Sequence, residues 1–523
     1  MAEGEGAVRA EPSPLSDKIV RNVLFGGLRS VLIAPVPFLL TPLILHKIGA
    51  VGYGTWAVFM AINGMTSLAD LGLVGTVSKF VAEHNANRDY VSLNRLLNTG
   101  LAVFALLSAV LVGALWAASG HVERLFFRGS AGSAAELTTL FRYFLVVIAA
   151  NILILLFSSV TTGLQRMDLT NVMSAFNTLC AAIVGAILLI RDWGLRGLLY
   201  GQICAVLLTL LGYFVLIARL LPLIRLNPAV IEVGEARRIF GFSLRLYFTQ
   251  AAVAVHNNIE KLLLSSFVGV ASAGWYDIAN DVALKIRGVI GLVLGPVMPA
   301  ASELGAKKDE RRLVELYFRA HKYLAFLGLP IVFYVALICN RFVALWIGPN
   351  FAAVALPLAI LVGVNFLNLV SGPGFLIFAG NGNLEPGMRS ATLGIVLNVV
   401  LSFVLILRFG FTGAVAGTSI ALSVASFYFL YQFHSQKGYS VARLLRDSYA
   451  RPLAWSFALF VGFRFMRLAF EATWKGLVLQ GVLFAALYLF GMLFSQFFDR
   501  YDWAKLETAV PFARHLKRML PVA

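Results

Sequence analysis

Residues 239–303 read IFGFSLRLYFTQAAVAVHNNIEKLLLSSFVGVASAGWYDIANDVALKIRGVIGLVLGPVMPAASE. This apolar stretch is long enough for two membrane-spanning helices, because about 20 residues cross a bilayer. It nevertheless carries Arg245, His256, Glu260, Lys261, Asp277, Asp281, Lys285 and Arg287. A charged side chain near the bilayer centre costs roughly 3 kcal/mol. We therefore expect these side chains to face a protein interior or a water-filled cavity.

The spacing of these residues follows helical periodicity. Arg245, Thr249, His256 and Glu260 are separated by four, seven and four residues, which places them on one helical face. Asp277, Asp281 and Lys285 recur every four residues, so Asp281 and Lys285 are expected to pair while Asp277 stays freer. The first face is interpreted as lining a central path. The alternative is that these groups form buried ion pairs that join helices.

The composition excludes a water-soluble globule. The chain has 523 residues, of which 59% are hydrophobic and 13% charged, which is too little polar surface to cover a soluble domain. We predict an all-α polytopic membrane protein. The net charge of +17 is scattered over short connections, so no nucleic-acid partner is expected. Cys180, Cys204 and Cys339 lie in apolar segments, and neither a disulfide, a metal nor a cofactor is predicted.

Apolar runs predict about fourteen transmembrane helices. They lie near residues 22–45, 54–80, 96–118, 141–163, 171–190, 197–220, 242–268, 272–300, 322–346, 352–378, 389–408, 411–433, 450–470 and 476–498. Lys and Arg concentrate in alternate connections, so both termini are expected to be cytoplasmic and the first span uncleaved. The basic connections 307–322 (KKDERRLVELYFRAHK) and 436–451 (QKGYSVARLLRDSYAR) are expected to fix this orientation and to attract anionic lipid head groups.

An internal repeat relates the two halves of the chain. GLRGLLYGQICA (194–205) and GFTGAVAGTSIA (410–421) share their glycine spacing, and IGAVGYG (48–54) resembles VGVASAGWY (268–276). Both matches imply an offset of about 220 residues. Helices 1–6 and 7–12 are thus predicted to form two homologous bundles, with a binding site between them and transport by alternating access.

The repeat suggests the following boundaries. They are an N-terminal cytoplasmic segment (1–21), an N-lobe (22–221), an interlobe linker (222–241), a C-lobe (242–434), helices 13 and 14 (435–498) and a cytoplasmic tail (499–523). The longest outward loop holds no cluster of catalytic residues, and no nucleotide-binding or zinc motif occurs, so the chain is not expected to be an enzyme.

The candidate site residues are the ionisable groups of the spans. Substrate binding is assigned to Arg29, Arg245, Lys261, Arg287 and His256, and ion coupling to Asp70, Glu260, Asp277 and Asp281. A basic excess suits an anionic substrate, because guanidinium groups match phosphate oxygens. The alternatives are that Arg245 and Lys285 are neutralised by carboxylates and that Asp70 caps a helix break. Asn151, Asn365, Asn368 and Asn398 are expected to hydrogen-bond across helices.

Two segments carry a family resemblance. NVLFGGLRSVLIAPVPFLLTPLILHKIGAVGYGTWAVFMAINGMTSLADLGLVGTVSKFVAE (22–83) and IEKLLLSSFVGVASAGWYDIAND (259–281) resemble the polysaccharide-transporter branch, which includes O-antigen flippases, of the multidrug/oligosaccharidyl-lipid/polysaccharide exporter superfamily. The resemblance implies two six-helix lobes in a V plus two trailing helices. It also implies an oligosaccharide substrate on a polyprenyl diphosphate, engaged by basic cavity residues. Glu260 stands where the family more often has Asp.

The predicted function is therefore a flippase in the cytoplasmic (inner) membrane. It would move lipid-linked oligosaccharide repeats for exopolysaccharide, capsule or O-antigen assembly. The expected partners are this substrate and the bilayer, and a polysaccharide polymerase and glycosyltransferases are candidates. A cation-coupled multidrug exporter is the first alternative, and a membrane-embedded polysaccharide polymerase or ligase is the second.

Overall fold

The chain is described by a computed structural model. It covers residues 33, 35–66, 72–130, 132–222, 227, 230–232, 234, 235, 237, 254, 255, 257–465 and 471–509. Throughout these residues the regular structure is helical and no strand occurs, which confirms the predicted all-α class. The chain divides into two compact units, Met1–Gly274 and Trp275–Ala523. The predicted lobe boundaries near residues 222–241 fall largely outside the described residues and stay predictions.

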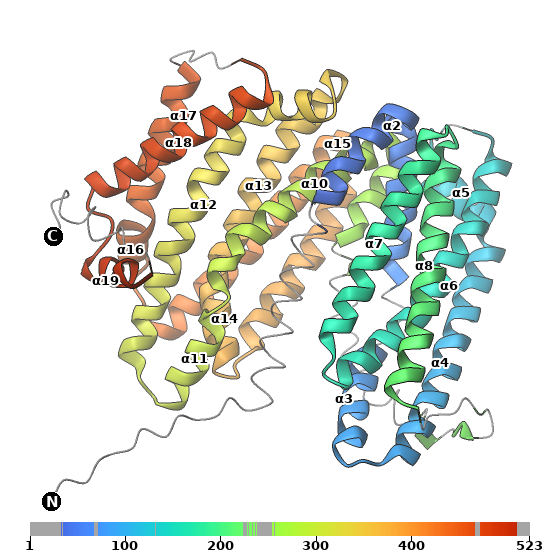
Figure 1. The fold of residues 1–523 in the computed structure, drawn as a ribbon. Coiled ribbons are helices and arrows are strands. Elements are labelled where there is room, and N and C mark those ends of the chain that lie inside the picture. The colour runs from blue at the N-terminus through green and yellow to red at the C-terminus, as the bar shows by residue number, and fades with distance from the viewer. Residues whose placement is uncertain are drawn as a thin grey trace, which may run out of the picture. The chain divides into compact units, whose positions relative to one another are not determined.

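Unit 1 is a bundle of long helices. Its elements are α2 (Pro35–Met65), α3 (Leu73–Ala86), α4 (Tyr90–Ala117), α5 (Ser119–Phe126), α6 (Ala134–Gly163), α7 (Met167–Ile190) and α8 (Gly194–Leu220), followed by a helix over residues 257–267. Helices α4, α6, α7 and α8 run alongside one another (Figure 1). Phe59 of α2 stacks on Phe144 of α6 at 5.0 Å and meets Phe127 edge-on at 4.9 Å, which builds a buried aromatic core.

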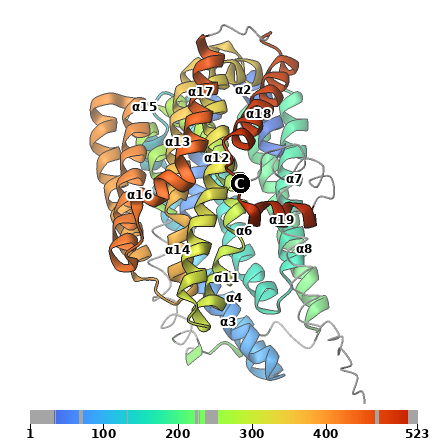
Figure 2. The ribbon, with the colours of Figure 1, turned by 90° about the vertical axis from the view of Figure 1, so that its left-hand side faces the viewer.

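Unit 2 holds the remaining helices. They are α10 (Val270–Gly291), η3 (Leu292–Leu294), α11 (Val297–Ala306), α12 (Glu310–Trp346), η4 (Pro349–Val354), α13 (Ala355–Val370), α14 (Gly372–Gly380), α15 (Glu385–Lys437), α16 (Val441–Leu444), the π-helix η5 (Leu445–Tyr449), α17 (Ala450–Phe465), α18 (Trp474–Phe494) and α19 (Arg500–Ala509). The first turn of α10 belongs to unit 1. Figure 2 shows α17 and α18 alongside α12, with α19 lying across them.

The helices have the length and composition of membrane spans. Among the described residues, ten helices are long and apolar enough to cross a bilayer. Two of them, α2 and α15, each cover parts of two predicted spans and bend at Gly49 and Gly410. At these glycines φ is 68° and 58°, a backbone conformation that residues with a Cβ atom adopt at a cost. The chain is therefore a multi-pass membrane protein.

Backbone geometry reproduces the internal repeat. Ten of the fifteen described residues with positive φ form five pairs, 216 to 220 residues apart. These pairs are Gly49 and Gly269, Arg88 and Lys308, Gly129 and Gly348, Gln165 and Gly382, and Gly194 and Gly410. In the second pair the next residue, Asp89 or Asp309, caps the following helix by accepting a backbone N–H. Both halves of the chain thus make the same turns, as the predicted repeat requires.

Candidate functional site

The predicted site residues that the structure describes lie on two helices. They are Glu260 and Lys261 on the helix at residues 257–267, and Asp277, Asp281 and Arg287 on α10. The other four, Arg29, Asp70, Arg245 and His256, fall outside the described residues. The structure therefore places five of the predicted site residues on α10 and on one turn of the preceding helix, and the path itself stays a prediction.

Glu260 lies in a closely packed part of unit 1. Its side chain is buried, Lys261 is half-buried, and both interact with other groups, as charges removed from water require. Asn258 on the same helix packs against Gly64 of α2, where a Cβ atom would come within 2.7 Å of the Asn258 amide. A charged side chain is thus held where the helix approaches α2 closely.

Two acidic residues and one lysine follow one face of α10. Asp281 and Lys285 form an ion pair one turn apart, which confirms the pair predicted from their spacing. Asp277, one turn earlier, is half-buried and interacts with another group. Because Asp281 neutralises Lys285, that lysine adds little positive field to the helix.

Arg287 is held by a neutral partner. Its Nη2 donates to Oδ1 of Asn368 on α13 at 2.8 Å, and Nδ2 of Asn368 donates to Oγ of Ser426 on α15 at 3.0 Å. Among the described residues no carboxylate forms an ion pair with Arg287. The contact joins three helices through a hydrogen bond to a charged donor, a type that contributes about 1.5–3 kcal/mol. Within the described part of the chain, this contact gives Arg287 a partner that carries no compensating charge.

The positive and negative charges of the predicted site helices are equal in number over the residues that the structure describes. Lys261, Lys285 and Arg287 are positive, and Glu260, Asp277 and Asp281 are negative. The predicted basic excess therefore depends on Arg29 and Arg245, set against Asp70, and these three lie outside the described part of the chain. Arg287 is distinguished by its partner and not by a local surplus of positive charge.

Asparagines join helices at three of the four predicted positions. Asn151 donates to Asn63 at 3.1 Å, Asn368 links α10 to α15, and Asn398 donates to Thr418 at 3.4 Å across the bend of α15. Asn365 differs, because its Nδ2 donates to the Leu361 carbonyl of its own helix. The described residues show no cross-helix hydrogen bond of Asn365, because an asparagine side chain can donate to a carbonyl of the preceding turn.

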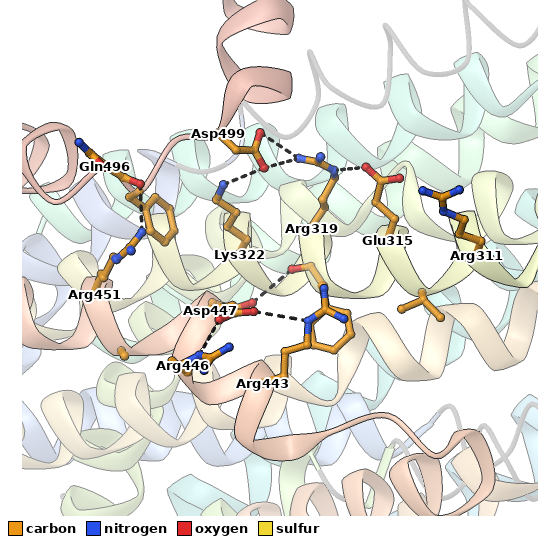
Figure 3. A pocket seen from close by; sticks show the side chains of 15 residues that line it. Arg311, Glu315, Arg319, Lys322, Arg443, Arg446, Asp447, Arg451, Gln496 and Asp499 are labelled. Atoms are coloured by element: carbon orange, nitrogen blue, oxygen red, sulfur yellow. Dashed lines mark hydrogen bonds and ion pairs between the residues drawn. The ribbon is translucent and has the colours of Figure 1, made fainter. Parts of the chain in front are cut away.

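The described residues contain no group of three or more His, Cys, Asp or Glu side chains placed to hold a metal ion. Cys180, Cys204 and Cys339 are free thiols. What sequence reasoning missed is the partner of Arg287, because Asn368 is 81 residues away and no spacing rule connects them. It also missed that the two basic connections at residues 307–322 and 436–451 border one pocket (Figure 3).

Comparison with known proteins points to one family. Residues 19–305, more than half of the chain, match the profile of the family described as "Polysaccharide biosynthesis protein". A putative O-antigen transporter of Shigella flexneri is 23% identical over 391 residues, covering 71% of this chain and 87% of that protein. A probable low-salt glycan biosynthesis flippase of Haloferax volcanii, Agl15, is 22% identical over 383 residues, covering 72% and 76%.

A solved structure shares the fold. The lipid II flippase MurJ in its inward closed conformation superposes with a TM-score of 0.72, covering 90% of this chain and 98% of its own. The sequence identity over this match is 15%, so the likeness concerns the arrangement of helices.

Proposed function

Because this chain belongs to the family of polysaccharide biosynthesis proteins, we propose that it is a flippase for polyprenyl-diphosphate-linked oligosaccharides. It would carry repeat units from the cytoplasmic to the outer leaflet for exopolysaccharide, capsule or O-antigen synthesis. The relatives named as an O-antigen transporter and a glycan flippase support this substrate class. The multi-pass fold supplies helices and no strands over its described residues, which suits transport within the bilayer.

Arg287 is the proposed contact to the diphosphate. A guanidinium carries five N–H donors, and Arg287 uses one of them to bond Asn368. The remaining donors can meet phosphate oxygens, and the absence of a carboxylate partner among the described residues leaves the charge available. This neutral pairing is the observation on which the site assignment depends. Lys261, and Arg29, Arg245 and His256 outside the described residues, are proposed to assist.

Ion coupling is proposed for Asp70, Glu260, Asp277 and Asp281. Asp281 already pairs with Lys285, so a proton or cation arriving at Asp281 would release the lysine. Transport would proceed by alternating access, with the substrate head group entering from the cytoplasmic side and leaving outside. We further propose the cytoplasmic membrane as the location, with both termini cytoplasmic, and a polymerase that consumes the exported units as partner.

The test uses a deletion strain whose polymer is known. Arg287→Gln keeps a donor for Asn368 but removes the charge, so helix packing should persist while export falls roughly 10-fold or more. The measurement is the surface polymer together with the lipid-linked precursor, which should accumulate and resist an enzyme added from outside. Arg389→Gln, which breaks an exposed ion pair with Glu385, is the matched control and should export normally.

Two outcomes would redirect the proposal. Normal export by a well-expressed Arg287→Gln protein would remove Arg287 from the substrate site. Precursors that stay accessible from outside in the deletion strain, with only drug sensitivity altered, would instead favour a cation-coupled multidrug exporter. Accessible precursors that fail to be joined into polymer would favour a polymerase or ligase.

A further inference from the structure

A basic pocket of about 800 Å³ opens at one end of unit 2 (Figure 3). Its walls come from the first turns of α12, from the segment that runs through α16 and η5 into α17, and from the connection between α18 and α19. Sequence positions more than 100 residues apart therefore contribute to one cavity.

The basic pocket is strongly charged. Its charged lining residues are Arg311, Arg319, Lys322, Arg443, Arg446 and Arg451, together with Glu315, Asp447 and Asp499. Six positive groups thus face three negative ones in the lining, and the buried Asp502, which pairs with Arg319 and Lys322, reduces the surplus to two positive charges. Such a surplus in a concave site attracts and holds an anion.

The surplus is unevenly distributed. Arg319 and Lys322 are paired with Asp499 and with the buried Asp502 beside it. Arg443 and Arg446 share the single carboxylate of Asp447. Arg311 and Arg451 form no ion pair within the described part of the chain, and Arg451 donates only to the Gln496 carbonyl, at 3.0 Å. The uncompensated charge therefore lies with these arginines.

Aromatic rings hold the cations in place. The guanidinium of Arg443 lies 4.8 Å from the centre of the Phe318 ring, and that of Arg319 lies 3.9 Å from Tyr501. Lys322 lies 5.0 Å from the Phe497 ring. Side chains that are already ordered lose less conformational entropy when a ligand binds, so the pocket is preorganised for binding an anion.

The pocket lies where the helices leave the hydrocarbon layer. The uncharged runs of α12, α17 and α18 cover residues 323–339, 452–463 and 476–494, and Lys322, Arg451 and Gln496 stand next to the ends of these runs. The opposite face of the α16–η5 segment lines an apolar cavity of about 750 Å³ through Leu444, Leu445 and Tyr449. One short segment thus separates the basic pocket from an apolar cavity. The head groups and the acyl chains of a bilayer lie next to each other in the same way.

We propose that the basic pocket binds the phosphate of an anionic phospholipid head group. Phosphate is the anion that guanidinium groups match best, and the pocket lies at the level where the bilayer presents it. The bound lipid would join α12 to the α16–η5 segment and to the α18–α19 connection, three elements that are brought together by these charges.

The test measures lipid retention by the full-length protein in detergent. The probes are phosphatidylglycerol and, as the neutral comparison, phosphatidylcholine, read by native mass spectrometry. Arg311→Gln/Arg446→Gln removes two exposed pocket charges without touching the buried Asp502 network. Arg312→Gln/Arg389→Gln removes two exposed charges outside the pocket and is the matched control. Wild type and control should prefer phosphatidylglycerol, and the pocket variant should bind it roughly 10- to 30-fold more weakly.

Equal retention of phosphatidylglycerol by both double variants would overturn the proposal. A second arm adds pyrophosphate or inorganic phosphate to lipid-depleted protein. Stabilisation by these soluble anions, with no preference for phosphatidylglycerol over phosphatidylcholine, would show that the phosphate comes from solution and would overturn the lipid assignment. Neither readout depends on transport, so each stands apart from the proposed flippase activity.

Discussion

At the scale of single residues, Arg287 illustrates how a membrane helix keeps a charge available. An arginine paired with a carboxylate would present little field to a ligand, whereas one paired with an amide keeps its full charge. The Asn368 contact at 2.8 Å satisfies one donor, and the Asn368–Ser426 bond fixes the amide in turn. Over the described residues, the guanidinium is thereby positioned by neutral groups.

At Gly54 the helix backbone packs so closely against its neighbour that no side chain fits. A Cβ atom there would lie 1.9 Å from the Val270 carbonyl oxygen, and a Cβ atom added at Gly274, 220 residues further on, would lie 2.9 Å from the Gly54 Cα. Gly54→Ala must displace backbone, so we expect a loss of about 3 kcal/mol or more in unfolding free energy. The measurement is the fraction of protein that stays monodisperse after heating. Gly113→Ala, with no atom within 4 Å, should leave it unchanged, and equal heat resistance of the two variants would contradict the close crossing.

The sequence predicted local pairs and missed distant ones. Asp281 and Lys285 were predictable because residues four apart meet on any helix. Arg287 and Asn368 were not, because helix rotation and packing decide which side chains of two different helices meet. The same holds for Gly54 and Val270, whose motifs were recognisable as repeats but whose contact was not.

At the scale of elements, apolar run length predicted the helices well. Every predicted span overlaps described helical residues, although 22–45, 54–80, 242–268 and 450–470 are only partly described. Helix α12 begins at Glu310, whereas the predicted span begins at residue 322. At α2 and α15, two predicted spans join through a bent glycine instead of a loop. Hydropathy alone cannot distinguish a tight glycine bend from a short connection, because neither changes the apolar pattern.

Helix α19 is docked by charges, which makes its attachment sensitive to pH. Burial raises the pKa of the Asp499 carboxyl. The hydrogen bond from the Asp502 backbone N–H and the charges of Lys322 and Arg319 lower this pKa by more than burial raises it, so it lies below the ordinary aspartate value. A carboxyl with a lowered folded-state pKa stabilises the fold above its unfolded pKa and loses that contribution as the pH falls through the folded pKa.

We therefore expect α19 to loosen below about pH 4, where ordinary aspartates take up protons. Hydrogen exchange, corrected for intrinsic rates, should rise in residues 500–509 and stay unchanged in α8. Asp499→Asn should show the same loosening at pH 7. If acid leaves the exchange of α19 unaffected while the rest of the bundle is intact, the helix is held by its apolar contacts, such as the buried Trp503, and not by Asp499.

At the scale of the whole molecule, the five matched turns show that the two halves of the chain repeat the same pattern of helices and turns. The bends at Gly194 and Gly410 have φ values of 57° and 58°, and the turns before the Asp89 and Asp309 caps use basic residues with φ values of 54° and 52°. Duplicated turns fix where each chain segment reverses. Helices 13 and 14 fall outside the predicted repeat, and the described residues from 441 to 509 contribute η5, α17 and the α18–α19 connection to the basic pocket.

The last prediction concerns the orientation of the helices in the bilayer, tested at the two ends of α12. Lys307 and Asn350 are exposed and lie beyond opposite ends of α12. In a variant with Cys180, Cys204 and Cys339 replaced by alanine, Lys307→Cys should react with a membrane-impermeant maleimide only after permeabilisation of right-side-out vesicles. Asn350→Cys should react in sealed vesicles, because the Lys and Arg bias places residues 307–322 inside.

The reverse pattern would invert the topology. It would put the basic pocket in the outer leaflet and require the substrate diphosphate to enter from the side that lacks the basic connections. Reaction of both cysteines in sealed vesicles would instead contradict α12 as a span. The predicted pattern would place the excess of arginines on the cytoplasmic side, from which the proposed substrate would enter, so that the same charge bias that orients the helices would also concentrate anionic lipids there.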